Sequence, residues 1–305
     1  MELLNVKELL VAFSMYKKGF RKYELEVIHQ LSLNVNSGEI VAVVGSSGSG
    51  KSILAEAVLG LLPKNSHMHG EIFYKGNKVD KKSIRKYMGT DIAYIPQSVD
   101  HLDPVMKVGE QVVGVHGTKE RQKELFKQYN LPEGTEKKYP FQCSGGMARR
   151  VLVTSALMGK PDLIIADEPT PGLDLKMALE ALKDFRELAD RGTGILLITH
   201  DIDLALGVAD RIAVFYAGSI LEIAPVDDFV EHSERLRHPY SQALINALPQ
   251  NNFEPIKGTQ PYAGDLFSGC LFAPRCHKRD DKCACDVPMA DVRGGKVRCV
   301  HAADG

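Results

Sequence analysis

The chain has 305 residues, of which 44% are hydrophobic and 25% charged, and its formal net charge is −1. This composition is typical of a folded globular protein, and the length allows one large domain with an appendage or two domains. The near-neutral charge excludes a general electrostatic bias toward nucleic acid or anionic membranes. The amino-terminal segment lacks the features of a secretory signal, and no apolar run approaches the roughly 18 residues that span a bilayer. We therefore expect a cytoplasmic protein whose membrane role, if any, comes through partners.

The first 96 residues predict β-strands joined by turns. Short apolar runs at 9–13, 31–35 and 40–44 have the pattern of strands. Two more strand-like runs lie between residues 71 and 96, around the turn Lys75-Gly76-Asn77.

The strand at 40–44 leads into a loop that fits the phosphate-binding pattern G-x-x-x-x-G-K-[ST]. The loop consists of Gly45, Ser46, Ser47, Gly48, Ser49, Gly50, Lys51 and Ser52. Its glycines let backbone N–H groups point at phosphate oxygens, and the amphipathic run at 53–62 predicts a helix whose positive end adds to the attraction. We expect Lys51 to reach the outer phosphates and Ser52 to place its hydroxyl on Mg²⁺. The sequence thus predicts a nucleoside triphosphate site.

A helical, less apolar pattern from about residue 98 to 160 predicts a helical insertion. Strands and helices then alternate. The predicted strands are 163–166, 195–199, 212–215 and 220–223, and the predicted helices are 175–188 and a short one near Leu204. On the first of these helices, Leu175, Leu179, Leu182 and Phe185 are predicted to share one apolar face. This succession predicts an α/β core with a largely parallel sheet.

The strand at 163–166 ends in two carboxylates, Asp167 and Glu168. Beside the phosphate loop, Asp167 would face the magnesium shell and Glu168 the position of an attacking water. Taken alone, the pair fits an ordinary helix cap equally well. Its context favours the site, because Cys143-Ser144-Gly145-Gly146-Met147 precedes it and His200 follows the strand at 195–199.

In this order, these motifs resemble those of the ATP-binding cassette (ABC) family over residues 1–235. The resemblance implies that Gln97 is the residue of the glutamine loop and lines the Mg²⁺ ion and the water. It also identifies His200 as the switch histidine, near the γ-phosphate. An aromatic side chain ahead of the phosphate loop generally stacks on adenine in this family, and we predict Tyr23 for that role, with Tyr16 as the alternative.

The resemblance further implies that each active site is shared by two cassettes. Ser144, Gly145 and Gly146 match the signature motif, and they should open a helix whose N–H groups bind the γ-phosphate of ATP on the opposite subunit. Leu173-Asp174 match the dimer-contact loop. ATP and Mg²⁺ are therefore the expected substrate and cofactor, and Asp174 is expected near the nucleotide.

Five of the six cysteines lie near the carboxy terminus, at Cys270, Cys276, Cys283, Cys285 and Cys299. In a reducing compartment this clustering favours metal ligation over disulfides. Four of them, all except Cys285, would suffice for a tetrahedral zinc ion or a 4Fe-4S cluster. Spacing alone does not choose between zinc, a cluster and unligated thiols.

The segments 238–244 and 269–276 resemble the C-terminal extension of oligopeptide and dipeptide importer ATPases, a branch that includes nickel importers. For Cys270, Cys276, Cys283 and Cys299 the resemblance implies a structural 4Fe-4S cluster. We expect two domains: a cassette at 1–235, with an antiparallel β subdomain and a helical subdomain at about 98–160, and a small cysteine-rich extension at 236–305.

The resemblance also implies a function. The chain would hydrolyse ATP at the cytoplasmic face of the cell membrane and energise uptake of di- or oligopeptides. Its partners would be two membrane permease subunits, a second homologous ATPase subunit and an extracytoplasmic solute-binding protein, with no nucleic acid. Nickel or a metal chelate is the alternative cargo. A soluble cassette ATPase acting on nucleic acid or ribosomes is disfavoured because the chain lacks a long coiled coil and a second cassette.

Overall fold

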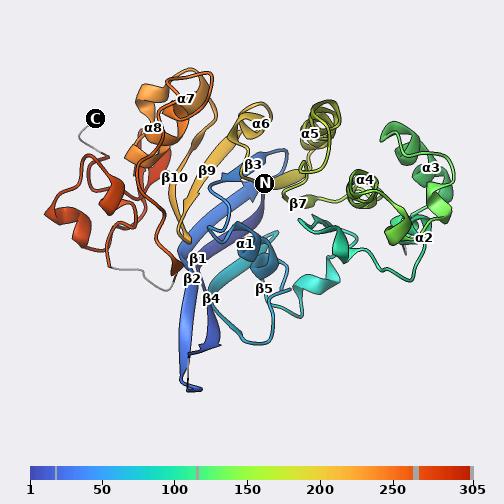
Figure 1. Cartoon of the computed structure of the whole chain (residues 1–305), viewed down its shortest axis with the longest axis horizontal. Helices are drawn as coiled ribbons and strands as arrows, with labels where there is room; N and C mark the ends of the chain where they lie inside the picture. Colours follow the sequence, from blue (N-terminus) through green and yellow to red (C-terminus); the bar gives the residue numbers. More distant parts are fainter. Residues whose placement is uncertain (18, 115–116, 264–267, 303–305) are drawn as a thin grey trace.

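The computed structural model describes residues 1–17, 19–114, 117–263 and 268–302, and Figure 1 shows their arrangement. The described strands are β1 (Glu2–Tyr16), β2 (Lys22–Asn36), β3 (Ile40–Val44), β4 (Ser66–Tyr74), β5 (Asn77–Val79), β6 (Ile92–Ile95), β7 (Leu163–Asp167), β8 (Gly194–Thr199), β9 (Arg211–Tyr216), β10 (Ser219–Pro225), β11 (Ala290–Val292) and β12 (Gly295–Val297). The described α-helices are α1 (Lys51–Val58), α2 (Val108–Val113), α3 (Lys119–Gln128), α4 (Gly145–Ala156), α5 (Leu175–Asp190), α6 (Ile202–Leu206), α7 (Asp227–Val230) and α8 (Pro239–Asn246). None of them combines the length and apolar character that crossing a bilayer requires.

The central sheet has eight strands in the order β11-β12-β10-β9-β3-β8-β7-β6. Strands β9, β3, β8, β7 and β6 are parallel. Every residue of β3, β7 and β8 is buried, as expected for parallel strands covered on both faces. The predicted α/β core with a largely parallel sheet is confirmed. The carboxyl ends of these strands meet at one edge, and this edge positions the site.

The antiparallel β subdomain is a second sheet with the order β2-β1-β4-β5. Strands β1 and β2 pair antiparallel along their whole length, from Glu2 opposite Asn36 to Tyr16 opposite Lys22. Their turn end projects from the body as an arm in Figure 1. The predicted strands of the first 96 residues are present, although β1 and β2 are much longer than the short runs expected.

The helical insertion comprises α2, α3, α4 and the short 3-10 helices around them. It has its own small core, formed by Leu102, Val108, Val112, Phe126, Leu131, Ala148, Val151 and Leu152. Figure 1 shows the insertion on one flank of the central sheet and the C-terminal segment on the other. A separate core lets the insertion pack as a unit beside the main sheet.

Two helix predictions need correction. Helix α1 ends at Val58 rather than near residue 62, because the chain turns at Gly60, whose φ is +64°. On α5, Leu175 and Leu179 are 68% and 52% exposed. The buried face consists of Met177, Ala178, Ala181, Leu182, Phe185 and Ala189. The stripe that packs on the sheet is therefore rotated from the predicted one, and only Leu182 and Phe185 belong to both.

The residues after 235, which we call the C-terminal extension, pack directly on the core. Strand β12 pairs antiparallel with β10, so β11 and β12 lengthen the central sheet. Arg237 is fully buried and donates to the carboxylates of Glu222 in β10 and Asp228 in α7, at 3.2 and 2.7 Å. Since breaking a buried ion pair is strongly destabilising, this contact anchors the extension. Sequence analysis predicted none of these strands and helices.

Candidate functional site

The phosphate loop connects β3 to α1 and packs too closely for side chains at two of its glycines. A Cβ on Gly45 would lie 2.3 Å from the carbonyl oxygen of Phe215 in β9. Gly50 has φ +104°, and a Cβ there would lie 3.2 Å from the carbonyl oxygen of Val27 in β2. These positions require glycine because any side chain would push the loop off the strands that shape it.

Lys51 is 5% exposed, and its ammonium group lies inside the loop. Its Nζ donates to the carbonyl oxygens of Gly45 and Ser46 at 2.8 and 2.9 Å. Burial lowers the pKa of Lys51, while Glu168 and Asp167 act to raise it. The loop thus has a positive charge at its centre, as a site for phosphate oxygens needs.

Three side chains whose oxygens could bind a cation lie beside Lys51. Ser52 Oγ lies 3.4 Å from Gln97 Oε1, and the Ser52 hydroxyl also lies beside the Asp167 carboxylate. Asp167 is 1% exposed, and within the described residues its Oδ1 has no hydrogen-bond partner. A buried carboxylate oxygen without a partner is costly, and hydroxyl, amide and carboxylate oxygens are the ligands that Mg²⁺ prefers. This donor set fits a magnesium ion held together with a bound triphosphate.

Glu168 and His200 form a hydrogen-bonded pair at the same edge. Glu168 Oε2 lies 2.6 Å from His200 Nδ1, and the Glu168 side chain is 7% exposed. Glu168 has φ +50°, and its N–H donates to the carbonyl oxygen of Ile198 at 2.8 Å. Such a backbone conformation is strained for glutamate and is typical of functional sites. The geometry presents a buried carboxylate, oriented by an imidazole, next to the cation site.

Comparisons with known proteins agree with this geometry. Residues 28–171 match the family described as "ABC transporter", and residues 221–283 match "Oligopeptide/dipeptide transporter, C-terminal region". The Escherichia coli (strain K12) dipeptide transport ATP-binding protein DppD is 34% identical over 328 residues, which cover 100% of this chain and 98% of DppD. The Bacillus subtilis (strain 168) oligopeptide transport ATP-binding protein AppD is 35% identical, covering 92% of each chain.

The chain belongs to the oligopeptide/dipeptide family of ABC transporter ATP-binding proteins. The predicted resemblance is confirmed, and the chain is an ABC ATPase. Among solved structures, a dimeric ATP-binding cassette bound to ADP and Pi is similar with a TM-score of 0.64 and 25% identity, covering 73% of this chain and 99% of that one.

The signature residues of this ABC ATPase begin α4. Ser144 caps the helix, its Oγ accepting from the N–H of Met147 at 3.3 Å, and Ser144 and Gly145 are exposed. A Cβ on Gly146 would lie 3.1 Å from the carbonyl oxygen of Gly172, so the signature motif lies beside the dimer-contact loop. In Figure 1 the start of α4 belongs to the insertion, apart from α1 and the phosphate loop. The structure does not bring the signature to the chain's own phosphate loop.

Asp174 and Tyr23 lie on different elements, and their roles near the nucleotide stay predictions. Asp174 caps α5, its Oδ1 accepting from the N–H of Met177 at 3.0 Å. Tyr23 lies in the β1–β2 arm opposite Met15, under the ammonium group of Lys17. The β2 residue that contacts the phosphate loop is Val27, four residues or about 13 Å farther along the strand. The stacking role of Tyr23, and of Tyr16 beyond it, stays a prediction.

Sequence analysis missed Arg149 of α4, which is 3% exposed. Its guanidinium donates to the carbonyl oxygens of Pro96 and Gln97 at 2.6 and 2.9 Å. It also donates to those of Pro169 at 3.2 Å and Asp167 at 3.4 Å. One buried cation therefore joins the signature helix to the glutamine loop and to the end of β7. Its acceptors are backbone groups, so no side-chain motif marks the contact in the sequence.

In the C-terminal extension, Cys270 lies near three other cysteines. All six cysteines are free thiols. Burial raises the pKa of Cys270 to about 11, and neighbouring Cys299, Cys283 and Cys276 raise it further. Cys285 is exposed. The four thiols predicted as ligands thus share one neighbourhood, while Cys285 faces solvent.

A second group of potential metal ligands includes one of these cysteines, Cys283. Cys283 Sγ lies 3.6 Å from both Asp280 Oδ1 and His301 Nε2. The three ligand atoms lie within 4.8 Å of one another. Among the described residues, Asp280, Cys283 and His301 form the group whose ligand atoms lie close enough together to hold one metal ion, and Cys283 is also one of the four thiols predicted as cluster ligands.

The raised pKa of Asp167 gives a pH-dependent prediction. Burial raises this pKa to about 6 from 3.8, so the nucleotide-free fold loses stability as the pH rises from about 4 through 6 and the carboxylate ionises. Asp167→Asn should then raise the free energy of unfolding at pH 7.5 by about 3 kcal/mol, with a gain that shrinks toward pH 4. Denaturant unfolding at several pH values measures this, with exposed Asp162→Asn as the control. Equal gains at all pH values would contradict the prediction.

Arg149→Gln should lower kcat for ATP hydrolysis about 10- to 100-fold, because hydrogen bonds from a charged donor to the Gln97 and Asp167 carbonyls are lost. Arg150→Gln is the matched control, since Arg150 of the same helix donates to Tyr129, Asn130 and Gly146 instead. Steady-state kinetics over a range of Mg²⁺ concentrations, below the unfolding temperature of both variants, provides the measurement. Similar losses in the two variants would mean that Arg149 only stabilises the insertion.

Proposed function

We propose that this chain is the ATP-hydrolysing subunit of an importer of dipeptides or oligopeptides. The observation that carries the proposal is the convergence, at one sheet edge, of the Lys51 loop, the Ser52–Gln97–Asp167 oxygens and the Glu168–His200 pair. The peptide cargo is supported by the match of residues 221–283 to the oligopeptide/dipeptide C-terminal region and by relatives named for dipeptide and oligopeptide transport.

Each residue at this edge has a distinct task in hydrolysis. The loop N–H groups and Lys51 bind the β- and γ-phosphates of ATP. Glu168 orients a water molecule in line with the γ-phosphorus and accepts its proton as the phosphorus–oxygen bond to ADP breaks and phosphate forms. His200 fixes the Glu168 carboxylate through the 2.6 Å contact. Ser52, Gln97 and Asp167 would hold a magnesium ion, which would neutralise charge on the phosphates.

A facing ATPase subunit completes the site in this proposal. Ser144 and Gly145 are exposed at the start of a 12-residue helix, an arrangement suited to an anion supplied by another molecule. Since they lie apart from the chain's own loop, their ATP is that of the partner. The similar solved cassette is dimeric, which supports such a pairing. We infer a homologous second subunit, so that each active site combines residues from two chains.

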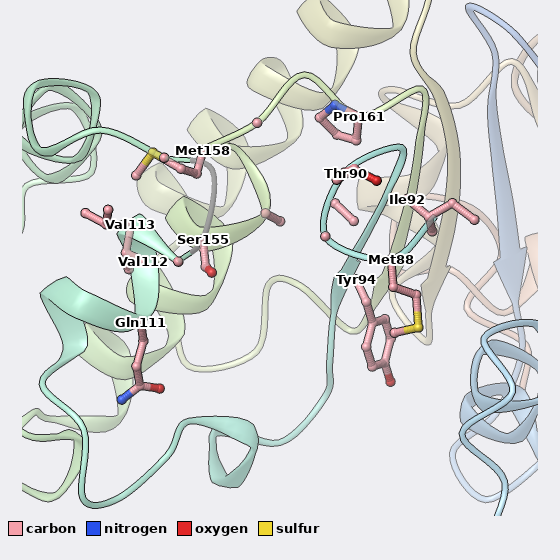
Figure 2. Close-up of a pocket in the computed structure, with 16 residues that line it drawn as sticks. Met88, Thr90, Ile92, Tyr94, Gln111, Val112, Val113, Ser155, Met158 and Pro161 are labelled. Carbon is pink, nitrogen blue, oxygen red and sulfur yellow. The ribbon is translucent and has the colours of Figure 1, made fainter. Parts of the chain in front are cut away.

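We also infer that a helix of a membrane permease docks in the hollow of Figure 2, which places the chain at the cytoplasmic face of the membrane. The hollow has a volume of about 400 Å³. Ile92 and Tyr94 line it from the central sheet, and Val112, Val113 and Met158 line it from the insertion. A helix held between these two bodies would move whenever the insertion shifts against the core. Two permeases and an extracytoplasmic binding protein would complete the importer.

For the cysteines we propose a structural 4Fe-4S cluster on Cys270, Cys276, Cys283 and Cys299. Their shared neighbourhood, the absence of disulfides among the described cysteines and the match to the importer C-terminal region support this assignment. Bound, the cluster would cross-link loops that otherwise have few strands and helices. Zinc on the mixed Asp280–Cys283–His301 set is the alternative that the geometry offers.

The ATPase assignment is tested by Glu168→Gln. We expect kcat to fall at least about 100-fold, because the general base is removed, while ATP binding persists. Glu180→Gln, an exposed change on α5, is the control. Hydrolysis is followed by phosphate release and binding by a fluorescent ATP analogue. Undiminished turnover in the Glu168 variant would refute the proposed role.

The cargo is tested in cells that lack the chain. Wild type should restore uptake of a labelled dipeptide or oligopeptide, and the Glu168→Gln variant should not. Restored uptake of labelled nickel instead, with peptide uptake unchanged, would refute the peptide assignment in favour of the metal alternative.

The cluster gives a separate prediction. Protein purified without oxygen should be brown and contain four iron and four acid-labile sulfide per chain, about the content of one 4Fe-4S cluster. Cys283→Ser should remove the iron, whereas Cys285→Ser should not. Colourless, folded protein that contains zinc would identify the mixed donor set, and metal-free folded protein would refute both assignments.

A further inference from the structure

The C-terminal extension touches the phosphate loop directly. Ser46 Oγ donates to Gln260 Oε1 at 2.8 Å, although the two residues are 214 positions apart in the sequence. A second side chain of the extension, Gln250, donates to Asp203 in α6, the helix that follows His200. The extension therefore contacts both segments that flank the γ-phosphate end of the proposed site.

Arg275 holds the segment that carries Gln260. Its guanidinium donates to the carbonyl oxygens of Lys257 and Ile256 at 2.8 and 3.0 Å, and to the Tyr216 hydroxyl at 3.2 Å. It also lies 5.8 Å from the ring centroids of Tyr216 and Phe272. Tyr216 ends β9, so Arg275 fixes the segment against the central sheet. The next residue after Arg275 is Cys276, one of the clustered thiols.

A cavity of about 330 Å³ separates the two parts where they meet. From the core it is lined by Gly45, Ser46 and His200, and from the extension by Ile256, Gln260 and Arg275, among others. The extension thus forms a wall beside the phosphate loop rather than a remote appendage. The Ser46–Gln260 hydrogen bond joins two residues that line opposite sides of this cavity.

We propose that the C-terminal extension is a working part of the nucleotide site, in which Gln260 positions the phosphate loop through Ser46 and Arg275 connects this contact to the cysteine-bearing tail. The inference rests on the proposed ATPase function. A loop of glycine and serine loses much conformational freedom when it closes on phosphates. A hydrogen bond that already restrains the loop lowers this cost, so it acts on ATP affinity and leaves the reacting groups untouched.

Gln260→Ala should therefore raise the Kd for ATP about three- to tenfold, the effect of one net hydrogen bond, and should change kcat less than twofold at saturating ATP. The matched control is Gln128→Ala, which removes an exposed glutamine of α3 that binds Asp184 of α5. Binding is measured with a fluorescent ATP analogue on the full chain. Unchanged or tighter binding in the Gln260 variant would overturn the proposal.

A double-mutant cycle shows whether the effect passes through Ser46. The Ser46→Ala, Gln260→Ala double variant should bind ATP no more weakly than the weaker single variant, because both changes remove the same contact. Fully additive losses would overturn the assignment. Arg275→Met should reproduce the loss of affinity, and combining it with Gln260→Ala should add nothing. If Arg275→Met does not fold, the Ser46–Gln260 cycle still decides.

These outcomes are distinct from failure of the ATPase proposal. If wild type hydrolyses ATP and Glu168→Gln does not, the reaction is established whatever Gln260→Ala does. The extension's role is then refuted by a Gln260 variant that binds and turns over ATP like wild type.

Discussion

The parallel pairing of β3, β8, β7 and β6 is the constraint on which the site depends. Their order in the sheet differs from their order in the sequence, so four segments far apart in the chain end at the same edge. The phosphate loop, Gln97, the Asp167–Glu168 pair and His200 each lie at the carboxyl end of one of these strands. The strands themselves are held by burial on both faces, which requires nearly continuous apolar sequence. Moving the register of β7 by one residue would turn Asp167 to the opposite face of the sheet.

Positive and negative groups balance one another's charge at this edge. Asp167 and Glu168 are buried next to the ammonium group of Lys51, and the Arg149 guanidinium lies below them on backbone carbonyls. Burying such charges is costly unless each has partners. Lys51 and Arg149 have theirs within the chain, whereas one oxygen of Asp167 has none among the described residues. A bound magnesium triphosphate would supply the partner that this Asp167 oxygen lacks, in keeping with the Mg²⁺ and ATP expected for an ABC ATPase.

Much of this could be predicted from the sequence because strand, loop and carboxylate motifs are local. The local sequence is enough to recognise the apolar runs of β3, β7 and β8 and the glycine pattern of the phosphate loop. The buried face of α5 could not be predicted as reliably, since Leu175 and Leu179 fit a helical stripe but point away from the sheet. Arg149 and Gln260 were missed for another reason. Arg149 binds backbone carbonyls 18 to 53 residues away, and Gln260 binds a serine 214 residues away, so these contacts exist only after the chain has folded.

The same long-range contacts connect the nucleotide site to two segments outside the central sheet. Arg149 connects the insertion to the glutamine loop on one flank, and Gln260 connects the C-terminal extension to the phosphate loop on the other. The anchor of the extension, the buried Arg237 with Glu222 and Asp228, is rigid, while the Ser46–Gln260 contact is exposed and weak. Because the Arg237 ion pairs hold the extension on the core, the Ser46–Gln260 hydrogen bond can form or break without unfolding the extension. Under the roles proposed above, loop order and ATP affinity would respond to the state of the tail, while the Glu168 carboxylate would stay in place.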